Sequence, residues 1–218
     1  MAMTNVAARL LTAKAAVFFW AAQGVQKIVI ADATGGELIQ GDDLSLLRQM
    51  NVQLEQISYN QNSEVVVAKG KGYAEGLLIQ FALNNSQLIK SSDFLYKCTG
   101  KIYCRNFDSI RQMIESGCIK NIFWRHVYDG DLSKPWADMR FFYASKEFCK
   151  NVLIPAYLNS DDAVAAAEYY CFSALNEKLQ LAKATRPLLS GFSGGTGKQY
   201  FDSSLGVIDL ACPCWVGL

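Results

Sequence analysis

The spacing of apolar side chains predicts alternating helices and strands in the first part of the chain. Apolar residues at helical spacing over residues 4–23 predict a helix, which is expected to stop at Gly24. A short β-branched run at 25–30 predicts a buried strand, and an alternating run at 52–59 predicts a half-buried one. A short helix is expected between them at 43–50. Helix, strand and polar glycine turn in this order are typical of a Rossmann-like α/β layer.

The rest of the chain continues this alternation. A brief Val-Val-Val strand at 65–67 is expected to lead through a glycine-rich stretch into a helix that runs to about residue 90. Further strands are predicted at 94–104, 119–124 and 138–144, and further helices at 106–116, 146–153 (capped by Ser145) and 163–183. The 218 residues suffice for one substantial domain, 1–218, with 186–218 as a candidate lid or tail.

Composition and charge exclude several classes of protein. Lys and Arg number 21 against 20 Asp and Glu, which gives no support for nucleic-acid binding. The 7 cysteines lie mostly in apolar runs and there is 1 histidine, so buried free thiols are expected rather than a zinc finger. Cys212 and Cys214 leave metal chelation or a strained disulfide open. No apolar run reaches the roughly 18 residues of a membrane span, so a cytoplasmic protein is expected. Its apolar tail at 205–218 packs on the body or touches a membrane surface.

The stretch at 69–76, Lys-Gly-Lys-Gly-Tyr-Ala-Glu-Gly, is the strongest candidate for a ligand site. Its glycines allow backbone conformations that other residues avoid, and they let a ligand approach closely. Helical spacing begins directly after it, so the stretch is expected to feed a helix N-terminus, where N–H groups and lysines favour phosphate. A solvated turn is the alternative, since glycine-rich loops are common.

Two further polar stretches are candidate neighbours of this loop. Asp32 and Thr34 follow the first strand, at the edge where Rossmann-like sheets bind ligands, although Asp32 could instead cap the next turn. The pair at 99–100, Thr-Gly, interrupts an apolar strand pattern, which indicates a bulge or a close approach to the backbone. Lys97 and Lys101 flank that pair and would add positive charge beside the glycine-rich stretch.

Four segments occur together in a fixed order. They read KGKGYAEG at 69–76, FLYKCTGK at 94–101, DMRFF at 138–142 and GFSGGTGK at 191–198. Together they resemble a family of bacterial glycosyltransferase-like proteins of capsule and lipopolysaccharide gene clusters, with the pattern GKGYGEG, K-x-TGR, DTRFF and a Gly-Ser-Gly loop. Ala74, Lys101 and Met139 depart from that pattern. Loss of the hydroxyl at 139 could remove a donor contact.

The resemblance implies a GT-A-like fold, that is, a Rossmann-like α/β three-layer sandwich with a mostly parallel central sheet. It also implies a nucleotide-sugar donor and a growing glycan, free or lipid-linked, as the acceptor, with peripheral contact to the inner membrane as an option. The residues expected at the donor and its phosphates are Asp32, Thr34, Lys69, Gly70, Lys71, Gly72, Glu75, Gly76, Lys97, Thr99, Gly100, Lys101, Arg140, Ser193 and Lys198.

Direct attack by an acceptor hydroxyl requires a general base within hydrogen-bond reach. The candidates are Glu168, Asp138 and His126. Glu168 lies on an otherwise apolar helix face, where a carboxylate needs a partner or a catalytic role. It could instead pair with Arg140 or Arg186, and Asp138 could form a structural ion pair with Arg140. His126 could equally be a core or surface residue. The sequence does not choose among them.

Many GT-A enzymes bind a divalent cation through an Asp-x-Asp motif. The only such spacing here, Asp129-Gly-Asp131, lies in a predicted loop. No cofactor is therefore expected, and lysines would stabilise the charge of the leaving diphosphate. A bound Mn²⁺ or Mg²⁺ is the alternative. A non-catalytic protein that binds nucleotides or phosphosugars is the competing function. A P-loop kinase is disfavoured because Gln199 stands where the motif requires Ser or Thr.

Overall fold

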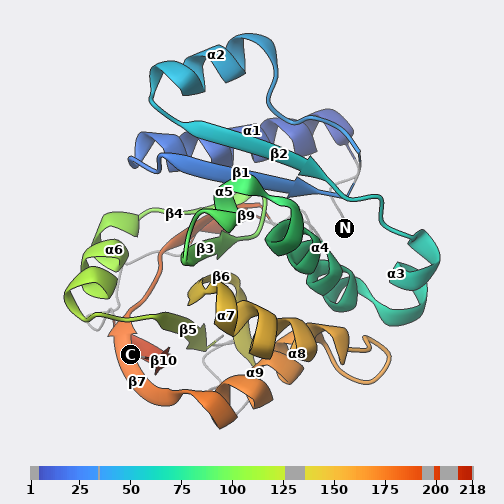
Figure 1. The fold of residues 1–218 in the computed structure, drawn as a ribbon, viewed down its shortest axis with the longest axis vertical. Coiled ribbons are helices and arrows are strands. Elements are labelled where there is room, and N and C mark those ends of the chain that lie inside the picture. Colours follow the sequence, from blue (N-terminus) through green and yellow to red (C-terminus); the bar gives the residue numbers. More distant parts are fainter. Residues whose placement is uncertain (1–4, 34, 126–135, 193–198, 202–210, 218) are drawn as a thin grey trace.

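The computed structural model describes residues 5–33, 35–125, 136–192, 199–201 and 211–217, and their strands form three sheets (Figure 1). A parallel pair consists of β1 (Lys27–Asp32) and β2 (Gln53–Ser58). A five-stranded sheet has the order β3 (Phe94–Cys98), β6 (Ala137–Ser145), β5 (Asn121–Arg125), β10 (Ala211–Gly217) and β7 (Gln180–Thr185). A small sheet consists of β4 (Ile102–Cys104), β8 (Leu189–Phe192) and β9 (Gln199–Phe201).

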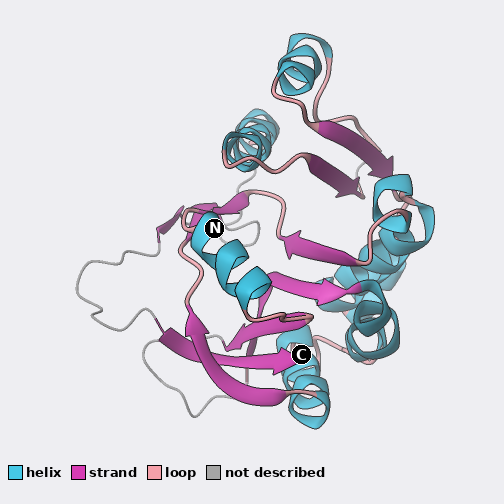
Figure 2. Ribbon diagram, turned by 60° about the vertical axis from the view of Figure 1, so that its left-hand side comes forward, coloured by secondary structure: helices cyan, strands magenta, loops and turns pink. Residues whose placement is uncertain are grey.

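The sheet directions contradict the expected mostly parallel central sheet. Every neighbouring pair in the five-stranded sheet is antiparallel, and among the strands that the structure describes only β1 and β2 run parallel (Figure 2). Parallel neighbours need a crossover connection, and the sequence supplies one between β1 and β2, where α2 (Gly41–Gln49) intervenes. The strand at the C-terminus instead inserts between β5 and β7, antiparallel to both. The GT-A-type sandwich expected from the resemblance is therefore wrong for this chain.

Helices cover both faces of the five-stranded sheet. Besides α2, the described helices of the whole fold are α1 (Val6–Ala22), α3 (Ser63–Lys69), α4 (Lys71–Asn85), α5 (Gln87–Lys90), α6 (Phe107–Ser116), α7 (Lys146–Phe148), the π-helical turn η1 (Cys149–Leu153), α8 (Ile154–Leu158) and α9 (Ala167–Lys178). Phe123 and Phe142 point to the face covered by α4 and α7–α9. Trp124 and Phe141 point to the opposite face, toward α6 and the small sheet. This double coverage explains why β5 and β6 are almost continuously buried.

The apolar tail packs on the body. Its described part, β10, is an interior strand, and Cys214 and Trp215 are fully buried there. Cys214 is a free thiol, and burial raises its pKa to about 11. Residues 211–217 of the tail are therefore part of the central sheet.

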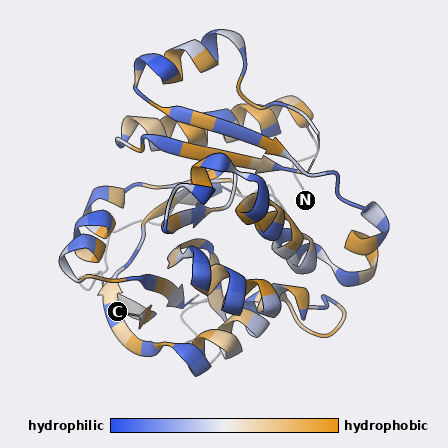
Figure 3. Cartoon of the chain, viewed as in Figure 1, coloured by the Kyte–Doolittle hydropathy of each residue, from blue (hydrophilic) through white to orange (hydrophobic). Residues whose placement is uncertain are grey.

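The parallel pair forms a separate layer with α1 and α2. Val17, Leu47 and Val52 are among the buried residues of this layer. Along β2 the apolar residues Leu54 and Ile57 stand among polar ones, and Figure 3 shows both colours along the strand. One of the polar residues, Glu55, anchors the layer to the helices below it. Its carboxylate accepts hydrogen bonds from Ser86 Oγ at 2.6 Å and from the N–H groups of Gln87 and Leu88 at 2.8 and 2.9 Å.

Replacing Glu55 with alanine is expected to cost about 1–2 kcal/mol of stability, because the first amides of α5 lose their acceptor. Burial raises the pKa of Glu55, but the bonds from Ser86, Leu88 and Gln87 outweigh it and the net pKa is lowered. A lowered pKa contributes stability above the unfolded value that is lost as the pH falls through the folded value. Urea unfolding at neutral and acid pH should therefore show a deficit that shrinks in acid. Glu64→Ala, at an exposed position, is the control; an equal loss in both variants contradicts the capping role.

The chain around the glycine-rich stretch is helical on both sides, which corrects two predictions. The Val-Val-Val segment belongs to α3 and is not a strand, and Val67 is 88% exposed. Helix α4 begins at Lys71, so Gly72 and Gly76 lie inside the helix rather than in a loop before it. Only Gly70, with φ of 94°, has the left-handed backbone expected of a loop glycine.

The two glycines within α4 permit close helix packing. A Cβ on Gly76 would lie 2.5 Å from the Cβ of Tyr157 in α8, and both residues are buried. Gly76→Ala is expected to cost about 1–3 kcal/mol through this overlap, although alanine has the higher helix propensity. Gly100→Ala is the control, because a Cβ there meets nothing within 4 Å. Equal urea midpoints for the two variants would show that α4 and α8 can separate without cost.

Candidate functional site

Lys97 lies at the centre of a polar cluster between β3, α4 and α9. Its ammonium pairs with Glu75 Oε1 at 2.5 Å and donates to the carbonyl of Met139 at 2.5 Å and to Thr99 Oγ1 at 3.2 Å. The Lys97 side chain is only 12% exposed. These three acceptors match the donor hydrogens of an ammonium group. Through these contacts Lys97, a residue of β3, joins Glu75 of α4 to Met139 of β6.

Glu168 is the carboxylate of this cluster that lies outside the Glu75–Lys97 ion pair. It is the second residue of α9 and half-buried, and it accepts a hydrogen bond from its own N–H. Its pKa is raised, chiefly by burial, and the negative charges of Glu75 and Asp162 raise it further, while its own N–H and Lys97 act in the opposite direction. A raised pKa makes a carboxylate the stronger base once it is ionised, which suits Glu168 to accept and release a proton.

Tyr157 is a member of the cluster that the sequence did not reveal. It is fully buried in α8, and its hydroxyl has no hydrogen-bond partner among the described residues. Its pKa is raised mainly by burial and next by the charges of Glu75 and Glu168. Tyrosine in an apolar helix pattern carries no signal that distinguishes it from an ordinary core residue, which is why sequence reasoning missed it.

Asp138 and Arg140 form an ion pair beside the cluster. Arg140 Nε and NH2 donate to the two carboxylate oxygens of Asp138 at 2.8 and 2.7 Å, and Arg140 N–H also donates to Oδ1 at 3.1 Å. Asp138 is 8% exposed. A structural ion pair with Arg140 was the alternative to a catalytic role for Asp138, and the structure contains that ion pair. The guanidinium engages both oxygens of the Asp138 carboxylate, which gives Asp138 a structural role in this ion pair. The carbonyl of Arg140 accepts from Thr99 N–H at 2.8 Å, which fixes the 99–100 turn against β6.

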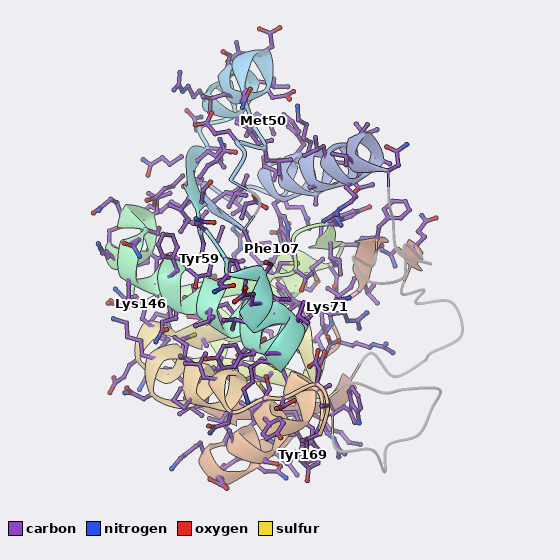
Figure 4. The ribbon with its side chains drawn as sticks, turned by 90° about the vertical axis from the view of Figure 1, so that its right-hand side faces the viewer. Met50, Tyr59, Lys71, Phe107, Lys146 and Tyr169 are labelled. Carbon is purple, nitrogen blue, oxygen red and sulfur yellow. The ribbon has the colours of Figure 1, made fainter. Side chains whose placement is uncertain are left out.

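The predicted phosphate loop meets acidic residues. The N–H of Lys71, at the start of α4, donates to Asp162 Oδ2 at 2.9 Å, and Lys69 pairs with Asp161 Oδ2 at 3.2 Å. Both lysines are exposed, and Figure 4 shows Lys71 close to the start of the helix. A carboxylate therefore holds the amide that was expected to bind phosphate. Phosphate contacts by Gly70, Gly72 and Gly76 stay a prediction, but the tight packing at each glycine already explains why no side chain stands there.

The remaining predicted residues are scattered or fall outside the description. Asp32 ends β1, and its carbonyl accepts from Tyr59 N–H at 2.8 Å, which places both at the carboxyl edge of the parallel pair. Lys101 lies near Arg9 of α1, and burial together with that charge lowers its pKa. Lys97 and Lys101 thus lie in different surroundings, and they do not add charge to one loop together. Residues outside the described ranges are Thr34, His126, Asp129, Asp131, Ser193 and Lys198.

Helix α4 connects the carboxyl edge of β1 and β2 to the polar cluster. Tyr59, labelled in Figure 4, packs its ring on Phe81 with 5.1 Å between centroids. Gln61 Nε2 donates to the carbonyl of Ala74 at 3.0 Å, one residue before Glu75. A ligand that spans these two regions would therefore lie along one helix.

A hollow in the surface lies away from the cluster. It is bounded by α2 and β2, and its polar lining includes Glu37, Arg48 and Gln56. None of the cluster residues lines it. Two 2.9 Å bonds hold Gln56 to the backbone of Ile39.

Neither a cluster of metal ligands nor a membrane-spanning helix occurs among the described residues. The described part of the chain holds no group of three or more His, Cys, Asp or Glu arranged to bind a metal ion. Within the described helices, none combines the length and apolar character needed to cross a bilayer. Comparisons of the chain with protein-family models, with curated proteins and with solved structures find no match.

Proposed function

We propose that this protein is a glycosyltransferase that moves a sugar from a nucleotide-activated donor to a hydroxyl group of a surface polysaccharide or lipopolysaccharide glycan. The observation that carries the proposal is the Glu168 carboxylate, half-buried and with a raised pKa, beside the Glu75–Lys97 ion pair. In the reaction the acceptor oxygen bonds to the anomeric carbon as the bond to the leaving diphosphate breaks. The acceptor proton passes to Glu168, and the electron pair leaves with the nucleoside diphosphate.

The charge balance of the cluster supports its assignment as the binding site of the glycan acceptor. Lys97 is occupied by its three acceptors, and Glu75, Glu168 and Asp162 contribute negative charge around it. A diphosphate would be repelled from such a place, whereas neutral hydroxyl groups can donate to the carboxylates. The acceptor glycan is therefore assigned to the cluster.

The donor is assigned to the carboxyl edge of the parallel pair. Ligands of α/β sheets bind beyond the carboxyl ends of parallel strands, and here that edge carries Asp32 and Tyr59. Lys69 and Lys71 are exposed at the start of α4 and supply positive charge for the leaving diphosphate. No cofactor is included, with Mn²⁺ or Mg²⁺ kept as the alternative.

A non-catalytic protein that binds nucleotides or phosphosugars is the second candidate. Asp162 favours it, because its carboxylate takes the first amide of α4 and must be displaced before phosphate can bind there.

Thermal unfolding with nucleoside diphosphates and nucleotide sugars, with and without Mn²⁺, tests both candidates. A ligand that binds the folded state raises the melting temperature with its concentration, as RT ln(1 + [L]/Kd). Release of nucleoside diphosphate in the presence of a glycan acceptor would support transfer. Stabilisation without release would favour the binding protein, and no response to any of these nucleotides would contradict both.

A further inference from the structure

Residues 159–166, which we name the strap, connect α8 to α9 and lie across the start of α4. Asp162 is bonded to the junction of α3 and α4 twice. Its N–H donates to the carbonyl of Lys69 at 3.2 Å, and its Oδ2 accepts from the N–H of Lys71 at 2.9 Å. Asp161 adds the ion pair to Lys69 Nζ at 3.2 Å. The strap is therefore held to α4 by backbone and side-chain bonds together.

Two glycines let the strap lie this close. A Cβ on Gly70 would come within 2.1 Å of Cγ of Asp162, and a Cβ on Gly72 would come within 2.4 Å of Cβ of Ala167. Ala167 is the first residue of α9, and Glu168 is the second. The seating of the strap on α4 thus sets where α9 begins, and with it the position of Glu168, the next residue of the helix.

We propose that Asp162 is a positioning residue, which holds the strap on α4 and thereby fixes the Glu168 carboxylate against the Glu75–Lys97 ion pair. The charged groups that face Glu168 are Glu75 from α4, Lys97 from β3 and Asp162 from the strap. The catalytic consequence rests on the proposed function, whereas the placement of Glu168 does not.

Two substitutions separate position from charge. Asp162→Asn removes the charge but keeps an oxygen that can accept the Lys71 N–H, while Asp162→Ala removes both. If Asp162 acted by charge alone, the two variants would change the pKa of Glu168 equally. Positioning predicts that the alanine variant differs from the asparagine variant, because α9 is then free to shift. The measurement is carbon NMR titration of glutamate-labelled protein, with the Glu168 signal assigned from its loss in Glu168→Gln.

The same variants are compared in transfer assays. Asp162→Ala is expected to lower kcat by about tenfold to 100-fold with KM little changed, since small misplacements of a catalytic group have effects of this size. Asp162→Asn is expected to lose less. Gly70→Ala, which keeps the charge of Asp162 but displaces the strap, should follow the alanine variant. Asp108→Asn, a surface carboxylate paired with Arg111 on α6, is the matched control.

The outcomes distinguish this inference from the proposed function. Equal Glu168 pKa values in Asp162→Asn and Asp162→Ala would overturn the positioning role, whatever the transfer assay shows. Different pKa values without transfer from any donor would support the positioning role and contradict the enzyme. Gly70→Ala with wild-type kcat would overturn the link between the strap and catalysis.

Discussion

Replacing Glu168 with glutamine is expected to lower the transfer rate by about 10²–10⁴-fold, the usual loss when a general base is removed. Donor binding should be unchanged, because the donor is assigned to the carboxyl edge of β1 and β2 and not to α9. In the wild type the rate should rise with pH through the raised pKa of Glu168, since only the ionised carboxylate accepts a proton. Steady-state kinetics across pH, with donor affinity measured separately, check each part.

The same substitution should increase stability at neutral pH. A folded-state pKa raised above the unfolded value means that folding favours the protonated form, so stability is fully present below the unfolded pKa and is lost as pH rises through the folded pKa. Glutamine cannot ionise and avoids that loss. The gain should vanish in acid, below the unfolded value.

Glu177→Gln is the control for both measurements, because Glu177 is exposed on the same helix. It should leave the transfer rate and the unfolding midpoint as they are in the wild type. Full turnover in Glu168→Gln would show that Glu168 is structural. A loss of donor affinity in that variant would move the donor site to α9.

Replacing Lys97 with methionine is expected to destabilise the fold by about 2–4 kcal/mol. The carbonyl of Met139 loses its donor, and the Glu75 and Glu168 carboxylates lose the cation between them. Removing one partner of a buried ion pair has a large cost because the other charge is left uncompensated. The estimate lies below the full penalty because the side chain of Glu75 is 36% exposed and can turn toward water. Urea unfolding measures the loss.

Lys14→Met is the matched control. Lys14 pairs with Asp43 at 2.6 Å, but both side chains are about one-third exposed, so the expected cost is about 0–1 kcal/mol. Combining Lys97→Met with Glu75→Met should recover part of the loss, which shows that the charge left behind causes it. A similar loss in Lys97→Met and Lys14→Met would contradict the role of Lys97 as the link between α4, β3 and β6.

Local sequence patterns determined most of the elements. The helices at α1 and α6, the strands β1, β2, β5 and β6, and the Ser145 cap, whose Oγ accepts from Phe148 N–H at 3.1 Å, agree with prediction. These elements could be predicted because the hydrophobic period and the capping residues that determine them lie within a few residues of one another in the sequence. The prediction of a strand at 65–67 was wrong. Its β-branched residues suggested a strand, but the Asn62 cap and the contacts with α4 favour a helix.

Strand direction and the membership of the cluster were decided only by the tertiary structure. The sequence alternation of helices and strands fitted a parallel sheet, but β3, β6 and β5 pair antiparallel, and β10 inserts antiparallel between β5 and β7. Lys97, Glu75 and Glu168 were each noted in the sequence, yet nothing in it paired Lys97 with Glu75 or placed Glu168 beside them. The glycines at 70, 72 and 76 were identified correctly as unusual, but they serve the contact of α4 with the strap, α8 and α9. Contacts between distant segments depend on how whole elements pack, which no local pattern encodes.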